Sequence, residues 1–337
     1  MPSTRFVYVL SPAKTLDLSP SCVLQCSQPR LLSHAHELIK QLRRLSQKEV
    51  KSSLGVSDAL GKLNFDRFQV FDTSKTATEA SKPSKPLKQA ALAFHGPAYQ
   101  GLELHDLSES DLAFAQTHLR ILSGLYGILR PCDLIQPYRL EMGQKLVNSR
   151  GRDLYEFWGD TIVSELDALF YKEETKDNAI KQQRVLINVA SQEYFKSLPT
   201  SALKAAGISV VECVFKDDGK IKSVYAKRAR GLMCRYLIQK RVDSLDGITG
   251  FDLEGYRYSK SASRDDKLVF TRTAAEQKAA LQQTKEAKAK TGPKARVKSD
   301  GTKRTGENQS MLEVSTENDD TGNSRLRRSS RKKRKTN

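Results

Sequence analysis

The segment Phe6-Val7-Tyr8-Val9-Leu10-Ser11-Pro12-Ala13-Lys14-Thr15 decides which fold the sequence predicts. Its apolar run, residues 6–10, is too short for a helix and predicts a buried strand. The run leads directly into Ser11, Lys14 and Thr15, two hydroxyls and a cation. In open α/β sheets the loops that follow the strands line the ligand crevice, so these three residues are candidates for binding an anion. A capped turn with a solvated lysine is the alternative, because no Walker or Rossmann glycine motif is present.

Working outward from this segment, strand-length apolar runs alternate with segments of helical spacing. Strands are predicted at 90–94, twice within 119–129, at 185–189, at 268–271, and as a hairpin of 210–215 and 221–226 around Asp217-Asp218-Gly219. Helices are predicted at 31–45, from Ser46 to about 54, at 59–63, 108–118, 154–170, 191–198 and 228–242. The alternation predicts an α/β fold in which one compact domain, residues 1–274, has a mixed sheet with helical cover.

The net charge of +18 is divided between this domain and the end of the chain. Residues 275–337 hold seventeen basic and eight acidic side chains, and the remainder carries the other +9. Apart from a transient helix at 275–290, we expect this tail to be disordered, because it has too few apolar residues to offset its chain entropy. The excess of positive charge favours a polyanionic partner, nucleic acid before acidic membrane surface.

The five cysteines have irregular spacing in a chain that shows no signal peptide, so we expect reduced thiols in the cytosol or nucleus. Cys22 and Cys26 with His34 and His36 do not match common zinc spacing. We therefore predict no metal and no cofactor. No apolar run approaches the length of about 20 residues that spans a bilayer, so no membrane contact is predicted.

A dense group of polar and aromatic residues lies within otherwise apolar sequence between 119 and 142. Its candidate residues are Arg120, Ser123, Tyr126, Arg130, Arg139 and Glu141. An arginine beside buried strands needs an acceptor, which is either a bound anion or an internal carboxylate such as Glu141. Both possibilities stay open from the sequence.

Two further segments are candidates for anion contacts. Asn188 and Ser191 lie at a strand-to-helix junction, where Ser191 could instead cap the helix. Lys227, Arg228 and Arg230 are predicted to open the helix at 228–242. Cations at a helix N-terminus oppose the helix dipole, which favours a role in ligand binding.

Residues 45–64 are typical of two short helices joined by a glycine turn at Gly55. In a helix-hairpin-helix element, backbone amides and nearby lysines hold DNA phosphates without contacting base edges. The candidate DNA-binding residues are Lys48, Lys51, Gly55 and Lys62. An ordinary helical pair is the alternative.

Residues 325–335 place eight cations in eleven positions. This run predicts recognition by a nuclear import receptor and non-specific contact with nucleic acid, against the alternative of a solvated charged tail. We therefore expect a nuclear location, a cytoplasmic one, or both.

The chain resembles the YaaA family of peroxide-stress-response proteins over about residues 5–272. The matching segments, in order, are Leu10 to Asp17, Leu63-Asn64 with Arg67, Ala93 to Gly96 with Tyr99 and Gly101-Leu102, Leu119 to Pro131, Pro137 to Gly143, Leu154-Tyr155 with Phe157 to Gly159, Asn188 to Tyr194, Lys227 to Gly231, and Gly255-Tyr256. The resemblance implies one α/β domain with a basic cleft and a helix-hairpin-helix element, DNA binding and protection from oxidative damage. It assigns no catalytic roles. The basic tail lies outside the family pattern and suggests a eukaryotic, nuclear version.

The sequence thus predicts a protein that binds double-stranded DNA non-specifically in the response to hydroperoxides. The alternative is an enzyme acting on a phosphate-bearing or nucleotide-like small molecule. In that case Lys14, Arg120 and Arg139 would hold the anion, with Glu141 or Tyr126 as acid or base.

Overall fold

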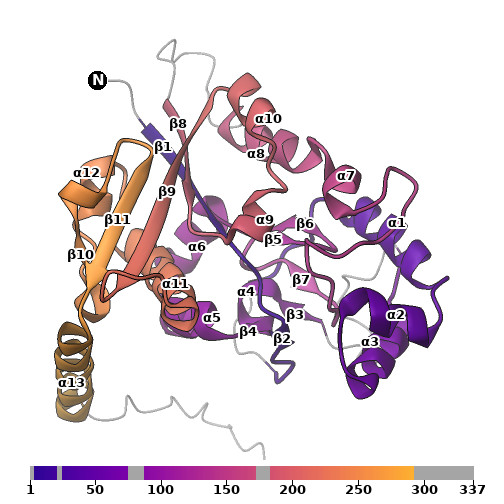
Figure 1. Ribbon diagram of the computed structural model, residues 1–337, viewed down its shortest axis with the longest axis horizontal. Coiled ribbons are helices and arrows are strands. Elements are labelled where there is room, and N and C mark those ends of the chain that lie inside the picture. The colour runs from indigo at the N-terminus through magenta and orange to yellow at the C-terminus, as the bar shows by residue number, and fades with distance from the viewer. Residues whose placement is uncertain (1–3, 21–24, 75–86, 172–182, 292–337) are drawn as a thin grey trace, which may run out of the picture. The chain divides into compact units, whose positions relative to one another are not determined.

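The computed structural model describes residues 4–20, 25–74, 87–171 and 183–291 of the 337-residue chain. The described residues up to Lys290 belong to one compact unit (Figure 1). The helices of eight or more residues are α1 (Leu32–Leu42), α2 (Gln47–Leu54), α3 (Asp58–Val70), α6 (Glu109–His118), α8 (Thr161–Tyr171), α11 (Ser223–Gln239) and α13 (Ala274–Thr291). The shorter ones are α4 (Ala90–Ala93), α5 (Pro97–Leu102), α7 (Leu154–Trp158), α9 (Gln192–Phe195), α10 (Thr200–Ala205) and α12 (Leu245–Thr249), with 3-10 turns η1 (Leu104–Asp106), η2 (Leu253–Gly255) and η3 (Lys260–Ala262).

Seven strands of the described chain form one mixed sheet, in the order β10-β11-β9-β8-β1-β5-β6. These strands are β1 (Thr4–Leu10), β5 (Leu119–Ser123), β6 (Gly127–Leu129), β8 (Gln183–Asn188), β9 (Ile208–Asp217), β10 (Arg257–Tyr258) and β11 (Lys267–Arg272). The five inner strands run parallel, and β6 and β10 pair antiparallel at the two edges. Two small ribbons join β2 (Thr15–Leu16) to β4 (Phe94–His95) and β3 (Lys88–Gln89) to β7 (Leu134–Ile135). The predicted α/β class with a mixed sheet is confirmed.

The core surrounds β1, whose residues 5–10 are all buried. A strand that is buried on both faces has a nearly continuous apolar sequence. Residues 6–10 therefore predict a buried strand although their apolar and polar residues do not alternate. Tyr8 and Val9 pair with β5 on one side and β8 on the other. The polar loop that starts at Ser11 therefore begins at the centre of the sheet.

Local signals placed several helix starts correctly. Ser46 forms the predicted capping box of α2 with Glu49, and Ser108, which starts the helix predicted at 108–118, forms a capping box of α6 with Asp111. Gly55 ends α2 in the left-handed conformation and leads into α3, so residues 45–64 do form two helices joined by a short turn. The helix predicted at 59–63 extends as far as Val70.

Two predicted elements differ in the structure. The strand predicted at 90–94 is wrong: residues 90–93 form α4, in keeping with the high helix propensity of its three alanines, and only Phe94 and His95 extend. The single helix predicted at 154–170 is divided into α7 and α8 by Gly159, whose φ of 45° lies outside the helical region.

The predicted hairpin of 210–215 and 221–226 is also wrong. The turn exists, with Asp218 and Gly219 at positive φ, but the chain then enters α11 at Ser223. A returning strand has no place beside β9, because β8 and β11 already occupy both of its edges. Lys227 and Arg230 consequently lie in the second turn of α11, not at its start.

Helices α5 and α11 pack side by side with their backbones in contact (Figure 1). A Cβ on Gly231 would lie 1.7 Å from the carbonyl oxygen of Ala98, and one on Gly101 would lie 2.4 Å from that of Arg228. Glycine at both positions permits this approach. The contact places α5 and the cationic turn of α11 on neighbouring walls of one pocket.

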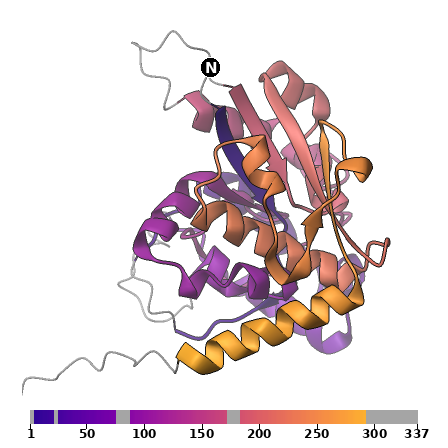
Figure 2. The same ribbon diagram turned by 90° about the vertical axis from the view of Figure 1, so that its left-hand side faces the viewer.

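In Figure 2, α13 leaves the end of β11 as one long helix. Its residue range includes 275–290, where the sequence predicts a transient helix. The rest of the predicted tail, including residues 325–335, lies outside the described residues.

Candidate anion-binding site at the carboxyl ends of the central strands

A pocket lies where the connections of the sheet change direction. From β1 the sheet continues through β5, and from its neighbour β8 it continues the other way through β9. Such a switch point leaves a crevice at the carboxyl ends of the two strands. Ser11 and Ser191 meet across it: the Ser191 amide donates to the Ser11 hydroxyl at 2.9 Å, and the two hydroxyls are 3.2 Å apart.

The cavity has a volume of about 370 Å³. Its walls come from the loop after β1, the start of α5, the loop after β7, the start of α9 and the second turn of α11. The predicted candidates among its lining residues are Ser11, Lys14, Thr15, Arg139, Glu141, Ser191, Lys227 and Arg230. The fold thus brings together residues that are more than two hundred positions apart in the sequence.

Glu141 ties two of the cations to the pocket wall. Its carboxylate lies 3.1 Å from Lys14 Nζ and 3.1 Å from Arg139 Nη2, and it accepts a hydrogen bond from Gln144. The internal Arg–Glu pair that the sequence left open therefore exists. It does not satisfy Arg139, because the buried Nε has no hydrogen-bond partner among the described residues. A buried donor without a partner is uncommon and marks a place for a ligand or water.

Arg230 lines the same pocket and is partly buried. Burial lowers the pKa of its guanidinium, and the Glu212 carboxylate opposes that shift. No hydrogen bond to this guanidinium is present within the described part of the chain. Lys227, one turn earlier on α11, is exposed at the same pocket. The walls thus carry four Lys or Arg side chains against two carboxylates, Glu141 and Glu193.

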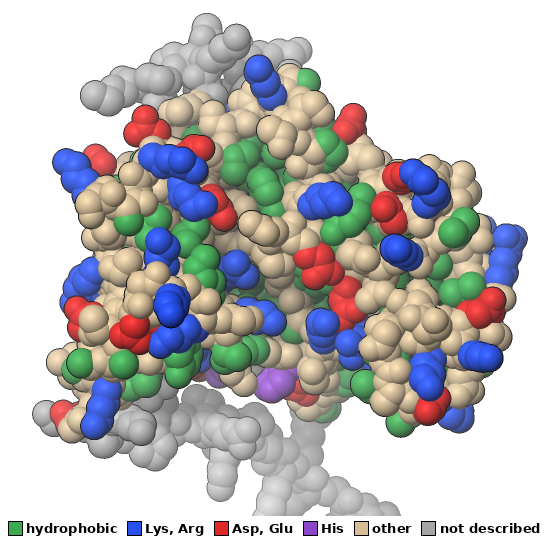
Figure 3. Space-filling view, viewed as in Figure 1, with side chains coloured by type: hydrophobic (Ala, Val, Ile, Leu, Met, Phe, Trp, Pro, Cys, Tyr) green, Lys and Arg blue, Asp and Glu red, His purple; other side chains and the backbone are tan. Residues whose placement is uncertain are grey.

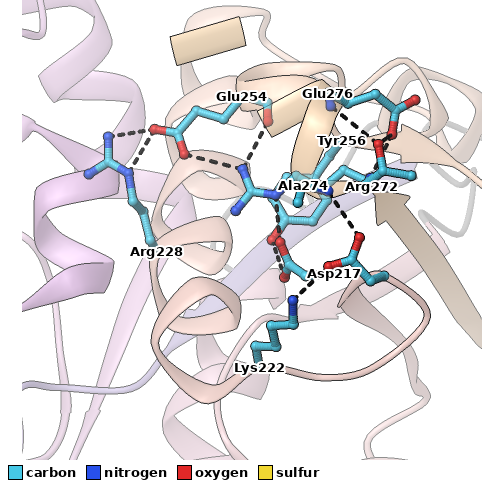
Figure 4. A network of polar contacts seen from close by, with 10 residues as sticks. Asp217, Lys222, Arg228, Glu254, Tyr256, Arg272, Ala274 and Glu276 are labelled. Carbon is cyan, nitrogen blue, oxygen red and sulfur yellow. Dashed lines mark hydrogen bonds and ion pairs between the residues drawn. The ribbon is translucent and has the colours of Figure 1, made fainter. Parts of the chain in front are cut away.

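A buried ionic network anchors the turn of α11 that carries these cations (Figure 4). Arg228 forms an ion pair with Glu254 at 2.6 Å, and Glu254 also lies 3.5 Å from Arg272. Arg272 is almost fully buried and pairs with Asp217 at 2.6 Å. Because Arg228 is held on this side, its helical neighbours Lys227 and Arg230 are oriented toward the pocket. Arg228 itself serves the network rather than a ligand.

The three tyrosines that line the pocket are neutral hydrogen-bonding groups. Burial raises the pKa of the Tyr99, Tyr138 and Tyr194 hydroxyls. Tyr99 donates to the Ser11 carbonyl at 3.1 Å, and Tyr138 shares a 2.6 Å hydrogen bond with Ser123. These tyrosines stay protonated at neutral pH, so none of them provides a phenolate base.

Five candidate residues do not line this pocket. Arg120 is buried, and its guanidinium donates to the carbonyls of Gln116 and Leu119. The expectation that it shares a site with Lys14 and Arg139 therefore fails. The contacts of the others are internal: Ser123 with Tyr138, Tyr126 with the Gln136 amide, Arg130 with Asp133, and Asn188 with the Ala190 amide.

The comparisons with known proteins assign the chain to one family. The family model described as peroxide stress protein YaaA matches residues 6–262. This chain belongs to the YaaA family. UPF0246 proteins of Burkholderia mallei strain SAVP1 and Burkholderia pseudomallei strain K96243 are each 48% identical to it over 273 residues, which is 80% of this chain and 99% of theirs. A UPF0246 protein of Burkholderia thailandensis is 47% identical over the same shares.

The YaaA match includes pocket residues that the sequence reasoning did not select. His95, Tyr99, Glu193 and Tyr194 line the cavity, and all lie in segments that carry the resemblance. No local spacing marks them, because their roles depend on α5 and α9 meeting the end of β1. Membership in the YaaA family was the one signal that pointed to them.

The candidate DNA-binding lysines of α2 and α3 are partly neutralised. Lys51 Nζ lies 2.7 Å from Asp58, and Lys62 Nζ lies 2.6 Å from Asp66. Lys48 is exposed. On the face shown in Figure 3, Lys and Arg side chains are dispersed among Asp and Glu rather than gathered in one continuous field. Among the candidate residues, the buried cationic donor without a hydrogen-bond partner in the described part of the chain is Arg139 Nε, which belongs to the pocket and not to the helical pair.

Across the described ranges, no group of three His, Cys, Asp or Glu side chains is arranged to hold a metal ion. None of the described helices is both long enough and apolar enough to cross a membrane.

Proposed function

We propose that this YaaA-family protein binds DNA without sequence preference in the peroxide stress response, and that the pocket holds one phosphate-bearing unit of the bound strand. The observation that carries the proposal is the pair of arginines that line the pocket, Arg139 and Arg230: the buried Nε of Arg139 has no hydrogen-bond partner among the described residues, and burial lowers the pKa of the Arg230 guanidinium. Arginine donors match the oxygens of a phosphate group in geometry and charge.

The size of the cavity limits what enters it. A volume of about 370 Å³ lies at the lower end of the range for small-molecule sites and is far too small for a duplex. We therefore expect one nucleotide or one phosphate to enter, while the rest of the strand lies outside. Of the helical pair, the exposed Lys48 is best placed to add a phosphate contact, since Lys51 and Lys62 have acidic partners.

A second candidate is an enzyme acting on a phosphate-bearing small molecule. The observation that favours it is the presence of carboxylates beside the cationic donors. Glu193 accepts a hydrogen bond from the Gly143 amide and faces the same cavity, so it is the candidate general base. Glu141 already accepts from three donors and serves to position Lys14 and Arg139.

Salt dependence separates the two functions. We would measure binding of the full-length protein to labelled duplex DNA and to a labelled mononucleotide at several salt concentrations. Backbone binding to DNA weakens steeply, with a slope of about 0.9 per neutralised phosphate in a log–log plot. If only the mononucleotide binds, and its affinity changes little with salt, the enzyme hypothesis replaces the proposal of DNA binding.

The variant Lys227→Gln tests the pocket against a matched control, Lys204→Gln. Both remove one exposed lysine, but Lys204 lies on α10 and does not line the cavity. We expect Lys227→Gln to weaken DNA binding equally for all sequences and to lower the salt slope by about one unit more than Lys204→Gln does. Equal losses in the two variants would show that the pocket takes no part in DNA binding.

A further inference from the structure

Two cysteines that are far apart in the sequence lie on paired segments. Ser27 and Asp133 form an isolated parallel bridge. The Ser27 amide donates to the Cys132 carbonyl at 2.9 Å, and the Leu134 amide donates to the Ser27 carbonyl at 2.8 Å. The residues that precede this bridge on its two segments are Cys26 and Cys132.

The parallel register places these two cysteines opposite each other. In a parallel pair, residues in register point to the same face, and neighbouring segments are about 4.8 Å apart. A disulfide requires Cα atoms roughly 4.4–6.8 Å apart, and the usual spacing of neighbouring segments falls within that range. Both cysteines are reduced in the structure.

Side-chain contacts hold the two segments in this register. The Ser27 hydroxyl donates to Asp133 at 2.7 Å and accepts from the Gln116 amide group at 2.8 Å. The carbonyl oxygen of that same Gln116 side chain accepts from the Cys132 amide at 2.9 Å. Asp133 also pairs with Arg130. Hydrogen bonds from both segments therefore stabilise the register that places Cys26 opposite Cys132.

The two thiols differ in exposure. Cys26 is exposed, whereas Cys132 is completely buried. Burial is the main reason that the pKa of Cys132 rises to about 11, and the neighbouring charges of Asp133 and Cys26 raise it further. The electrostatic effect of Cys26 on Cys132 agrees with their closeness in the backbone register.

We propose that Cys26 and Cys132 are a peroxide-reactive pair that forms a disulfide. The Cys26 thiolate attacks one oxygen of hydrogen peroxide, the O–O bond breaks, and hydroxide leaves; the hydroxide takes up the proton that the thiol had released, so that the products are a sulfenic acid and water. The Cys132 sulfur then attacks the Cys26 sulfur, and the hydroxyl leaves as water with the thiol proton. The two thiols lose two electrons and the peroxide gains them. The reaction is separate from DNA binding and does not depend on the anion pocket.

Cys213 and Cys234 provide an internal comparison. Both are buried, and burial raises the pKa of each thiol. Neither is exposed to start the reaction with peroxide. We therefore expect oxidation to be selective for the pair that has one thiol at the surface.

Peptide mapping tests the proposal directly. Full-length protein would be treated with hydrogen peroxide, blocked, and digested with trypsin without reduction. Cys26 lies in tryptic peptide 15–30 and Cys132 in peptide 121–139. We expect these peptides to be joined by a disulfide in the wild-type protein, and Cys132→Ser to carry a trappable sulfenic acid at Cys26 instead.

Cys22 shares the peptide of Cys26 and lies outside the described residues. The variant Cys22→Ser resolves the ambiguity: it should still join 15–30 to 121–139, whereas Cys26→Ser should not. A loop within peptide 15–30, linking Cys22 to Cys26, would overturn the proposal. So would oxidation of Cys213 or Cys234 at the same peroxide concentration, or no joined peptide at any concentration.

Discussion

At the scale of single residues, burial decides which ionisable groups stay available to a ligand. Arg120 was a candidate because an arginine in apolar sequence needs an acceptor, and two backbone carbonyls supply it. Arg139 has the same need, but one carboxylate satisfies only part of its guanidinium. The difference depends on how many acceptor oxygens lie near each guanidinium, and neither the spacing nor the composition of the sequence predicts that number.

His118 allows a test of burial by pH. Burial, above all, lowers its pKa from 6.5 to about 4, and its ring stacks on Phe114. The unfolded chain binds a proton near pH 6.5 and the folded one near 4, so stability falls as pH drops through this window. Between pH 7 and 4.5 the loss amounts to about 2 kcal/mol.

We expect His118→Gln, which carries no titrating ring, to lose about 2 kcal/mol less than wild type over the same range. Urea unfolding followed by the fluorescence of the single tryptophan, Trp158, measures both. Identical pH dependence in the two proteins would show that folding does not lower the pKa of His118.

At the scale of elements, the contact between α5 and α11 builds the pocket. Ala98 and Tyr99 come from one helix and Lys227 and Arg230 from the other. The two helices approach closely enough for the backbone of one to touch the other at Gly231. Any increase in their separation moves the cations away from the end of β1.

We predict that Gly231→Ala destabilises the protein by about 3 kcal/mol, since the new methyl group overlaps a backbone carbonyl that cannot rotate away. Gly96→Ala is the matched control, because its Cβ would meet Ala13 at an ordinary 3.4 Å. Thermal unfolding of the two variants gives the comparison. Similar melting temperatures would mean that α5 and α11 can separate at little cost.

At the scale of the whole molecule, the net charge of +18 has two sources of equal size. In the body, Lys14, Arg139, Lys227 and Arg230 line one pocket, while many of the other described cations have acidic partners. In the tail, eight cations fall within residues 325–335, beyond the segment that matches the YaaA family model. The two sources therefore predict different roles.

We expect deletion of 325–337 to move a fluorescent fusion of the protein from nucleus to cytoplasm in a eukaryotic cell, because the import receptor loses its basic run. The melting temperature should stay unchanged, since residues 325–337 contain a single apolar side chain, Leu326. Deletion of 308–320, the same number of residues without the basic run, serves as control. A fusion that remains nuclear after the first deletion rules out import through this segment.

The sequence alone determined the features that depend on neighbouring residues. The strand at 6–10 and the caps at Ser46 and Ser108 follow from local patterns, because apolar spacing and caps act within one or two turns of chain. The loop at Ser11 and Lys14 was placed correctly, since a loop after a central parallel strand lies at the ligand crevice. The YaaA family could likewise be recognised from its ordered motifs.

The tertiary structure decided what depends on distant partners. Residues 223–226 form the first turn of α11 and not part of a returning strand, because β11 already occupies the edge of β9, about fifty residues away in sequence. Lys14, Arg139 and Arg230 share a pocket, and Arg120 does not, because strand order and helix packing set those positions. Cys26 lies opposite Cys132 for the same reason, because tertiary packing brings their two segments together. Interactions of this kind are settled only when the chain closes its long loops, and no local pattern encodes them.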